Sequence, residues 1–163
     1  AGRDEDVNEI LRSLIPDLDS VFFLSEDKTH EPGAYIRTRN ESAPSPLGSH
    51  GEGVERLINL ALHMLSGSSS PLLVDEIDTG FHYSVLPKVW AVLIDETIRS
   101  GRQIFATTHS LDCLNGLATA IEERPSLAGI TAIHKLAPRL DFSVHFPGED
   151  IANAISNDIE VRG

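Results

Sequence analysis

Two short runs of apolar residues place the strongest limits on how this chain folds. The run LLV at 72–74 follows a stretch rich in Ser and Gly, and the run QIFA at 103–106 follows shortly after Gly101. Between them, residues 84–101 carry apolar side chains at helical spacing, with Ser84 placed to cap the helix and Gly101 at its end. Because strands that are apolar along their whole length are buried on both faces, this order predicts an α/β fold with central parallel strands flanked by helices.

The rest of the chain reads as further helices and as strands that pair antiparallel at the edges. In the first half, the pattern of apolar and turn residues predicts a helix at 4–15, a hairpin of strands at 18–27 and 33–40, a loop at 41–53 and a helix at 54–65. In the second half it predicts 111–122 (helix), 130–136 and 141–146 (strands), 149–157 (helix) and 159–161 (strand). We expect a single domain over 1–163.

The totals exclude several classes of protein. The chain has 163 residues, 40% of them hydrophobic, and no run of about 18 apolar residues that a membrane helix needs. A net charge of -12 argues against a chain that by itself wraps a nucleic-acid backbone. The single cysteine, Cys113, cannot form an internal disulfide, which favours a cytoplasmic location.

Polar side chains that can do chemistry follow both apolar runs. Asp75 and Glu76 come directly after the first run, and His109 follows the second within Thr-Thr-His-Ser. Each feature has an ordinary structural interpretation, since acids often end a strand in a solvated turn and a lone histidine is often a satisfied residue at the edge of a core. Parallel strands, however, end at one edge of a sheet, so we expect the three side chains to lie on one rim. Such a rim suits hydrated Mg²⁺, a water to be deprotonated and a phosphate oxygen.

A third feature is LGSHGEGVER at 47–56, directly before an apolar helix. Ser49, Gly51 and Gly53 leave backbone amides open to close approach, and the N-terminus of the helix behind them favours an anion. A flexible glycine loop explains this stretch equally well when it is considered alone.

The order of these three features resembles a known family. The loop, the helix, LLVDEIDTGFHYSVL, a second helix and QIFATTHS follow each other as in the C-terminal lobe of an ABC-type ATPase head. The resemblance is to AAA/ABC-like ATPases related to the OLD, SMC and RecF-like proteins. It covers about residues 47–115 and implies a partial P-loop NTPase fold.

The resemblance also implies roles for single residues. Asp75 matches the Mg²⁺-holding aspartate of a Walker B motif at 72–76, and Glu76 matches the catalytic glutamate that orients or deprotonates the attacking water. Asp78 belongs to a D-loop at 78–82, which lies against a dimer partner in this family.

The remaining two elements concern the γ-phosphate. His109 matches the switch histidine that hydrogen-bonds it. Ser49, Gly51 and Gly53 match the signature loop (47–56), which contacts the γ-phosphate of a nucleotide held by the opposite subunit; His50 departs from the glycine of transporter-type signatures.

One element of such a head is not in the sequence. A Walker A loop reads G-x-x-x-x-G-K-[ST], and the only lysines, Lys28, Lys88 and Lys135, all lack a preceding glycine. The chain therefore carries half of a nucleotide site. We expect it to be inactive alone, and we expect the N-terminal Walker A lobe to precede residue 1 or to come from another polypeptide. The resemblance implies ATP and Mg²⁺ as cofactors and a homodimer formed on ATP, and it allows DNA as a partner through other segments, without a membrane.

Two other functions remain open at this point. Asp75, Glu76 and Asp78 could bind catalytic metal directly in a metal-dependent nuclease or phosphatase, although this leaves the loop at 47–56 unexplained. The chain could also be a non-catalytic dimerisation lobe that has lost ATP chemistry.

Overall fold

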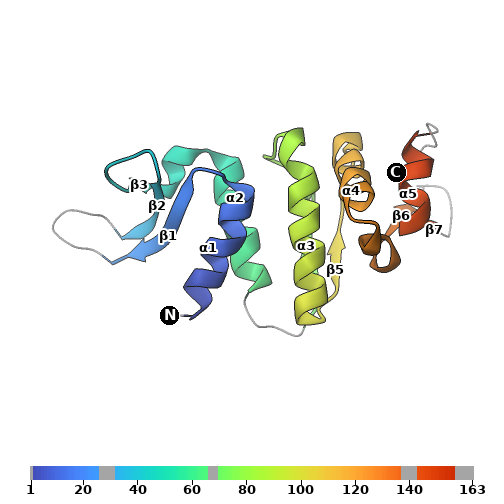
Figure 1. Cartoon of the computed structure of the whole chain (residues 1–163), viewed down its shortest axis with the longest axis horizontal. Helices are drawn as coiled ribbons and strands as arrows, with labels where there is room; N and C mark the ends of the chain where they lie inside the picture. The colour runs from blue at the N-terminus through green and yellow to red at the C-terminus, as the bar shows by residue number, and fades with distance from the viewer. Residues whose placement is uncertain (1, 26–31, 66–69, 137–142, 157–163) are drawn as a thin grey trace. The chain divides into compact units, whose positions relative to one another are not determined.

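The computed structural model describes residues 2–25, 32–65, 70–136 and 143–156. The chain divides into two compact units, Ala1–Ser68 and Ser69–Gly163. Each unit has its own strands, helices and buried side chains (Figure 1). The expectation of one domain over 1–163 stays a prediction.

In the first unit, helix α1 (Gly2–Leu14) packs against strand β1 (Leu18–Leu24) and against helix α2 (Glu52–Met64). The contact includes one buried polar group, because the side-chain oxygen of Asn8 in α1 accepts a hydrogen bond of 2.7 Å from the amide of Val21 in β1. A buried polar atom needs such a partner to offset its loss of water.

The strands of this unit form an antiparallel sheet in the order β1-β2-β3. Strand β2 (Gly33–Thr38) pairs with β1 as the predicted hairpin, and the short β3 (Ser45–Pro46) pairs with β2. A 3-10 turn at Leu47–His50 then leads from β3 into α2.

The second unit contains the parallel strands and the helices that the two apolar runs predict, but the strands are not buried on both faces as expected, because Leu73 and Phe105 are 75% and 56% exposed. Its helices and strands in chain order are β4 (Leu72–Val74), α3 (Leu86–Ser100), β5 (Ile104–Ala106), α4 (Leu111–Glu123), β6 (Ala132–Leu136), β7 (Ser143–Pro147) and α5 (Gly148–Ser156). Strands β4 and β5 run parallel, with Leu72 opposite Ile104 and Val74 opposite Ala106. Strands β6 and β7 form a separate antiparallel pair.

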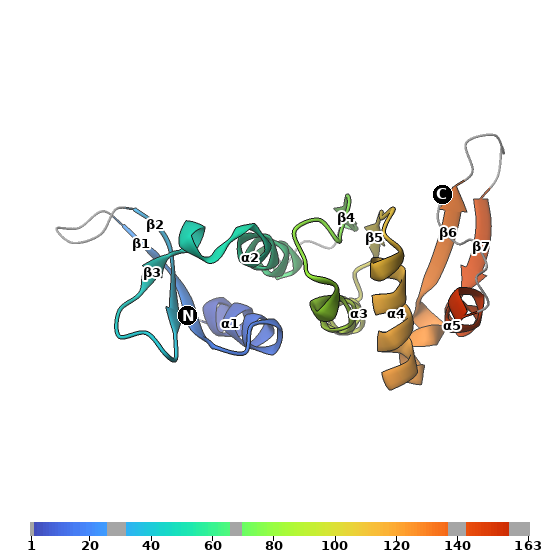
Figure 2. The same ribbon diagram turned by 90° about the horizontal axis from the view of Figure 1, so that it is seen from above.

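Helices α3 and α4 lie side by side in both ribbon views (Figures 1 and 2). Their close approach depends on Gly116 of α4, because a Cβ added there would lie 2.7 Å from Cβ of Leu86 in α3. Helix α5 packs on α4, and both contribute to a buried cluster. The buried members of that cluster are Ile94, Leu117, Ala118, Ile121, Leu127 and Ile151.

The structure differs from the sequence predictions at several places. Ser84 does not cap α3: it lies in a 3-10 turn at Tyr83–Val85, and its hydroxyl lies 2.9 Å from the ring of His82, which caps that turn instead. Within the described part of the second unit, the antiparallel strands β6 and β7 form a sheet of their own and are not hydrogen-bonded to the parallel pair. The segment Pro125–Ile130 forms a 3-10 helix that the sequence pattern did not indicate. The predicted strand at 159–161 lies outside the described residues.

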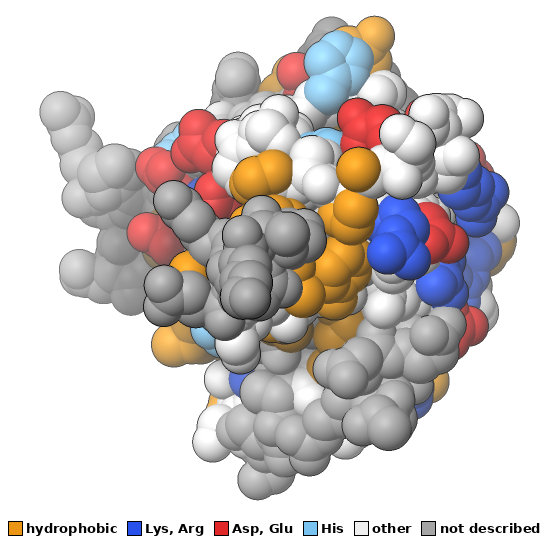
Figure 3. Space-filling model, turned by 90° about the vertical axis from the view of Figure 1, so that its left-hand side faces the viewer, with side chains coloured by type: hydrophobic (Ala, Val, Ile, Leu, Met, Phe, Trp, Pro, Cys, Tyr) orange, Lys and Arg blue, Asp and Glu red, His pale blue; other side chains and the backbone are white. Residues whose placement is uncertain are grey.

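The surface fits the composition. On the face drawn in Figure 3, Lys and Arg side chains gather at the right with acidic side chains among them, and apolar side chains lie near the centre. Among the described helices, none combines the length and apolar character that a membrane span requires.

Candidate functional site

The chain turns sharply where β4 ends. Asp75 and Glu76 are both exposed, whereas Ile77 directly after them is buried with 1% of its surface exposed. Glu76 has φ 46°, and no other residue except glycine has a positive φ in the part of the chain that the structure describes. A residue with a side chain in this region costs about 1–2 kcal/mol, so surrounding contacts must hold the backbone of Glu76.

Those contacts come from Thr107, at the end of the neighbouring strand β5. The hydroxyl of Thr107 donates a hydrogen bond to the carboxylate of Asp75 and accepts one of 2.9 Å from the amide of Glu76. The backbone of Thr107 also accepts a bond of 3.0 Å from the amide of Ile77 and donates one of 2.9 Å to the carbonyl of Val74. Thr107 thus ties both acids to β5.

The next residue, Thr108, holds the third acid. Its hydroxyl donates to the carboxylate of Asp78 and accepts a 3.0 Å bond from the amide of Ser110. Ser110 in turn caps α4, because its side chain accepts a bond of 3.3 Å from the amide of Cys113. Burial raises the pKa of the Cys113 thiol to about 11, while a hydrogen bond with Thr108 works in the opposite direction.

His109 stands between Thr108 and the first turn of α4. Its side chain is exposed, and its ring makes no hydrogen bond to another described residue. The same edge of the β4–β5 pair thus carries Asp75, Glu76, Asp78, the two threonines and His109, and we call this group the rim. Hydrogen bonds join Asp75, Glu76 and Asp78 to the two threonines, and His109 follows directly after Thr108 in the chain. That these side chains act together at one site stays a prediction.

The loop at 47–56 lies in the first unit and combines a 3-10 turn with the start of α2. Gly51 has φ 86°, which favours glycine, and α2 begins at Glu52, so Gly53 lies inside the first helical turn rather than in the loop. The hydroxyl of Ser49 donates a 2.7 Å bond to the carbonyl of Pro46.

His50, the departure from the transporter-type signature, has a partner of its own in this loop. Its Nε2 lies 2.7 Å from the hydroxyl of Ser45. The hydroxyl of Ser45 also contacts Glu41, so the histidine is part of a polar cluster at the start of the loop.

The rim offers one well-placed carboxylate to Mg²⁺, but its residues are not grouped to hold the ion by themselves. Asp75 is an exposed carboxylate held in place by Thr107, and Mg²⁺ commonly takes one or two protein carboxylates together with phosphate oxygens and water. Within the described ranges, no three or more His, Cys, Asp or Glu side chains are grouped to hold a metal ion. The direct three-carboxylate site of the nuclease alternative is therefore not formed by Asp75, Glu76 and Asp78 in this structure.

Thr107 and Thr108 lie within the Thr-Thr-His-Ser segment, but the sequence alone predicted no role for either of them. The signal was present in the sequence, because the two threonines directly follow one apolar run and the acids directly follow the other. Thr79 was also missed; its hydroxyl donates a weak 3.3 Å bond to the carboxylate of Glu76.

The fold is that of the ATPase heads of SMC proteins. One similar chain comes from work on the ATP-driven dimerization and DNA-stimulated activation of SMC ATPases, with a TM-score of 0.65, 14% identity, and coverage of 99% of this chain and 93% of that one. The SMC head domain from Thermotoga maritima matches with a TM-score of 0.56 and 16% identity over 88% of this chain and 46% of that one. The Smc head domain with a coiled coil and joint from Pyrococcus yayanosii matches with a TM-score of 0.61 and 13% identity, over 96% and 29%.

This likeness defines a mixed α/β, P-loop NTPase-like ATPase fold. The sequence identifies the family more closely: residues 2–114 match the family described as AAA domain, putative AbiEii toxin, Type IV TA system. The chain belongs to this family of AAA ATPase domains. No curated protein matches it. This chain spans nearly all of the first of the three solved chains above, but less than half of the length of the other two.

Proposed function

We propose that this chain is the C-terminal part of an ATPase head, and that it completes an ATP-hydrolysing site when a Walker A lobe from outside this sequence joins it. The rim carries the proposal. Asp75, Glu76 and His109, from segments more than 30 residues apart, follow the ends of two parallel strands. Thr107 is hydrogen-bonded both to the carboxylate of Asp75 and to the amide of Glu76. A strand end with surplus charge would not need this set of hydrogen bonds.

Each rim residue has a task in this proposal. Asp75 would hold Mg²⁺, which would supply positive charge to neutralise the charge that develops on the phosphates. Glu76 orients the attacking water and takes its proton. His109 donates a hydrogen bond to the γ-phosphate, and positioning with charge stabilisation supplies most of the catalysis in phosphoryl transfer.

The signature loop acts on a second nucleotide. Gly51 and the N-terminus of α2 present backbone amides that favour an anion. In this state the hydroxyl of Ser49 donates to Pro46, so Ser49 must turn away from that carbonyl before it can contact a γ-phosphate. We propose that two heads dimerise around ATP, with the D-loop at 78–82 against the partner.

The chain by itself is expected to bind ATP poorly and not to hydrolyse it, because the phosphate-cradling loop is absent from its sequence. A cytoplasmic location and contacts with DNA through other segments remain predictions.

The test is Glu76→Gln in the protein that includes the Walker A lobe. Because the amide cannot take a proton, we expect ATP turnover to fall about 10²- to 10⁴-fold, while an ATP-bound dimer accumulates in sedimentation experiments. Glu122→Gln is the matched control, since Glu122 is an exposed acid on α4. Turnover by Glu76→Gln at the rate of the control would refute the role of Glu76.

A further inference from the structure

Strands β6 and β7 have one covered face and one exposed face. Ile133 and Phe146 pack against the buried cluster to which α4 and α5 contribute. Because side chains alternate along a strand, the positions next to these two residues turn the opposite way. We call that side the open face, and its exposed side chains are Ala132, His134, Leu136, Ser143 and His145.

The open face brings together two histidines from different strands. His134 is directly opposite His145 in the register, and their ring centres are 4.8 Å apart, with an angle of 36° between the ring planes. Two imidazole nitrogens that bind one metal ion at about 2.0–2.1 Å each lie about 3 Å from each other. Rings as close as these bring nitrogens on their facing edges within reach of that separation. The pair therefore has the spacing of two ligands of one ion.

The surroundings of the pair suit a cation. Nδ1 of His134 lies 3.4 Å from the hydroxyl of Ser143. A partner on this nitrogen leaves Nε2 for a metal ion, and metal-binding imidazoles commonly have their second nitrogen hydrogen-bonded in this way. Lys135 is the only lysine or arginine within β6 and β7, and the alternation of side chains places it on the side opposite the histidines. A permanent positive charge from these two strands therefore does not share the open face.

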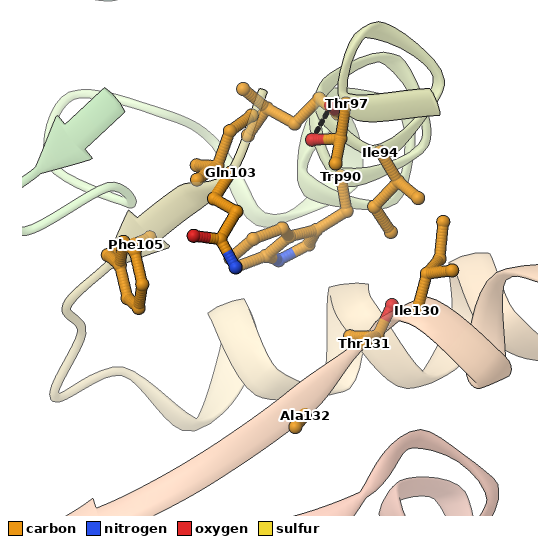
Figure 4. Close-up of a pocket in the computed structure, with 11 residues that line it drawn as sticks. Trp90, Ile94, Thr97, Gln103, Phe105, Ile130, Thr131 and Ala132 are labelled. Carbon is orange, nitrogen blue, oxygen red and sulfur yellow. Dashed lines mark hydrogen bonds between the residues drawn. The ribbon is translucent and has the colours of Figure 1, made fainter. Parts of the chain in front are cut away.

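The histidine pair is separate from the pocket that borders the open face. That pocket has a volume of about 310 Å³, and Ala132 is the last residue of β6 that lines it (Figure 4). Neither His134 nor His145 is among its lining residues. The rim follows other strands, β4 and β5. A ligand of the histidine pair thus uses side chains that have no task in the proposed ATPase.

We propose that His134 and His145 together bind one divalent transition-metal ion of the class of Zn²⁺, Ni²⁺ and Cu²⁺. Imidazole nitrogen suits these ions, whereas Mg²⁺ prefers oxygen ligands. Among the described residues, no third His, Cys, Asp or Glu joins the pair, so water completes the coordination. The site is therefore weaker than a structural site with four protein ligands. Because the two ligands come from different strands, the bound ion stabilises the pairing of β6 with β7. This proposal does not rest on the proposed function.

The first test is calorimetric titration of the full chain with Zn²⁺, without nucleotide. Loss of a group that only orients a ligand already costs about 10- to 100-fold in metal affinity. We therefore expect His134→Gln and His145→Gln each to weaken Zn²⁺ binding at least about tenfold. His63→Gln is the matched control, since His63 is an exposed histidine of α2, and it should leave the affinity unchanged. Equal affinities of the wild-type chain and the two strand variants would overturn the proposal, and so would an equal loss in the control.

The second test needs no substitution, so it does not depend on how a variant folds. Cu²⁺ binds most tightly among these ions, and its unpaired electron broadens NMR signals of nearby nuclei. Substoichiometric Cu²⁺ should broaden the ring signals of His134 and His145 together, before those of His109 and His63. Earlier broadening of His109 would place the ion at the rim and overturn the proposal. Broadening of only one histidine of the pair would also overturn it, because the ion would then have a single ligand.

Neither test involves ATP or the Walker A lobe. Metal binding by the pair in a protein without ATP turnover would refute the ATPase proposal and leave this site standing. Turnover in a protein whose histidine pair binds no metal would have the opposite meaning.

Discussion

Replacing Thr107 by valine tests whether the rim is positioned by the hydrogen bonds of this threonine. The substitution keeps the shape of the side chain but removes one bond to a carboxylate, worth about 1.5–3 kcal/mol, and one from a backbone amide, worth about 0.5–1.5 kcal/mol. Thr107, Asp75 and Glu76 are exposed, so water replaces part of both bonds. If the backbone of Glu76 leaves its left-handed conformation, the folded state is relieved of about 1–2 kcal/mol of strain, which offsets part of the loss. The net loss of stability should therefore be only about 1 kcal/mol, or about 2–4 °C in the melting temperature.

Catalysis should respond much more strongly than stability. If Glu76 relaxes to an ordinary conformation, its carboxylate moves, and a displacement of about 1 Å can lower kcat about 10²-fold. The assays are thermal unfolding of this chain and ATP turnover of the protein that includes the Walker A lobe. We expect a lower kcat with little change in KM for Thr107→Val, and near-normal values for Thr107→Ser, which keeps the hydroxyl.

A matched control is Thr119→Val, which removes the bond from a half-buried threonine to the carbonyl of Asn115 on α4. The reasoning is refuted if Thr107→Val and Thr119→Val have the same kcat. A lower melting temperature with unchanged kcat would mean that Thr107 supports the fold but does not position Glu76.

Two further predictions concern the second unit. Gly116→Ala should lower the free energy of unfolding by about 1–3 kcal/mol, because the added Cβ would lie 2.7 Å from Cβ of Leu86. Gly129→Ala should be nearly neutral, because a Cβ added there meets nothing within 4 Å. Equal losses of stability for the two variants in urea unfolding would contradict the close packing of α3 and α4. Burial raises the pKa of Cys113 from its ordinary 9.0 to about 11, so the folded chain holds this proton more tightly than the unfolded chain. The contribution of Cys113 to stability should be complete below pH 9 and should be lost as the pH rises to about 11. Urea unfolding between pH 8 and about 11 checks this, and Cys113→Ala should show a smaller decline.

The sequence predicted local structure well where periodicity carried the signal. The parallel pair of β4 and β5, the hairpin of β1 and β2, and helices α3 and α4 all follow from the spacing of apolar residues. The prediction failed at Ser84 because a competing neighbour, His82, engages its hydroxyl and its amide. Such competition between possible caps depends on the conformation of the turn, which apolar spacing does not indicate.

The candidate site residues were readable from the sequence alone: the acids after one apolar run, the histidine after another, and a set of lysines that cannot form a Walker A loop. Those features depend only on which residues follow one another. Only the tertiary structure decided that Thr107 and Thr108 hold Asp75 and Asp78, and that Glu76 adopts a left-handed backbone. The physical reason is register: which side chains meet across two strands is set by how the strands are aligned. Runs as short and as uniformly apolar as LLV and IFA lack the alternation of polar and apolar residues that would specify that alignment.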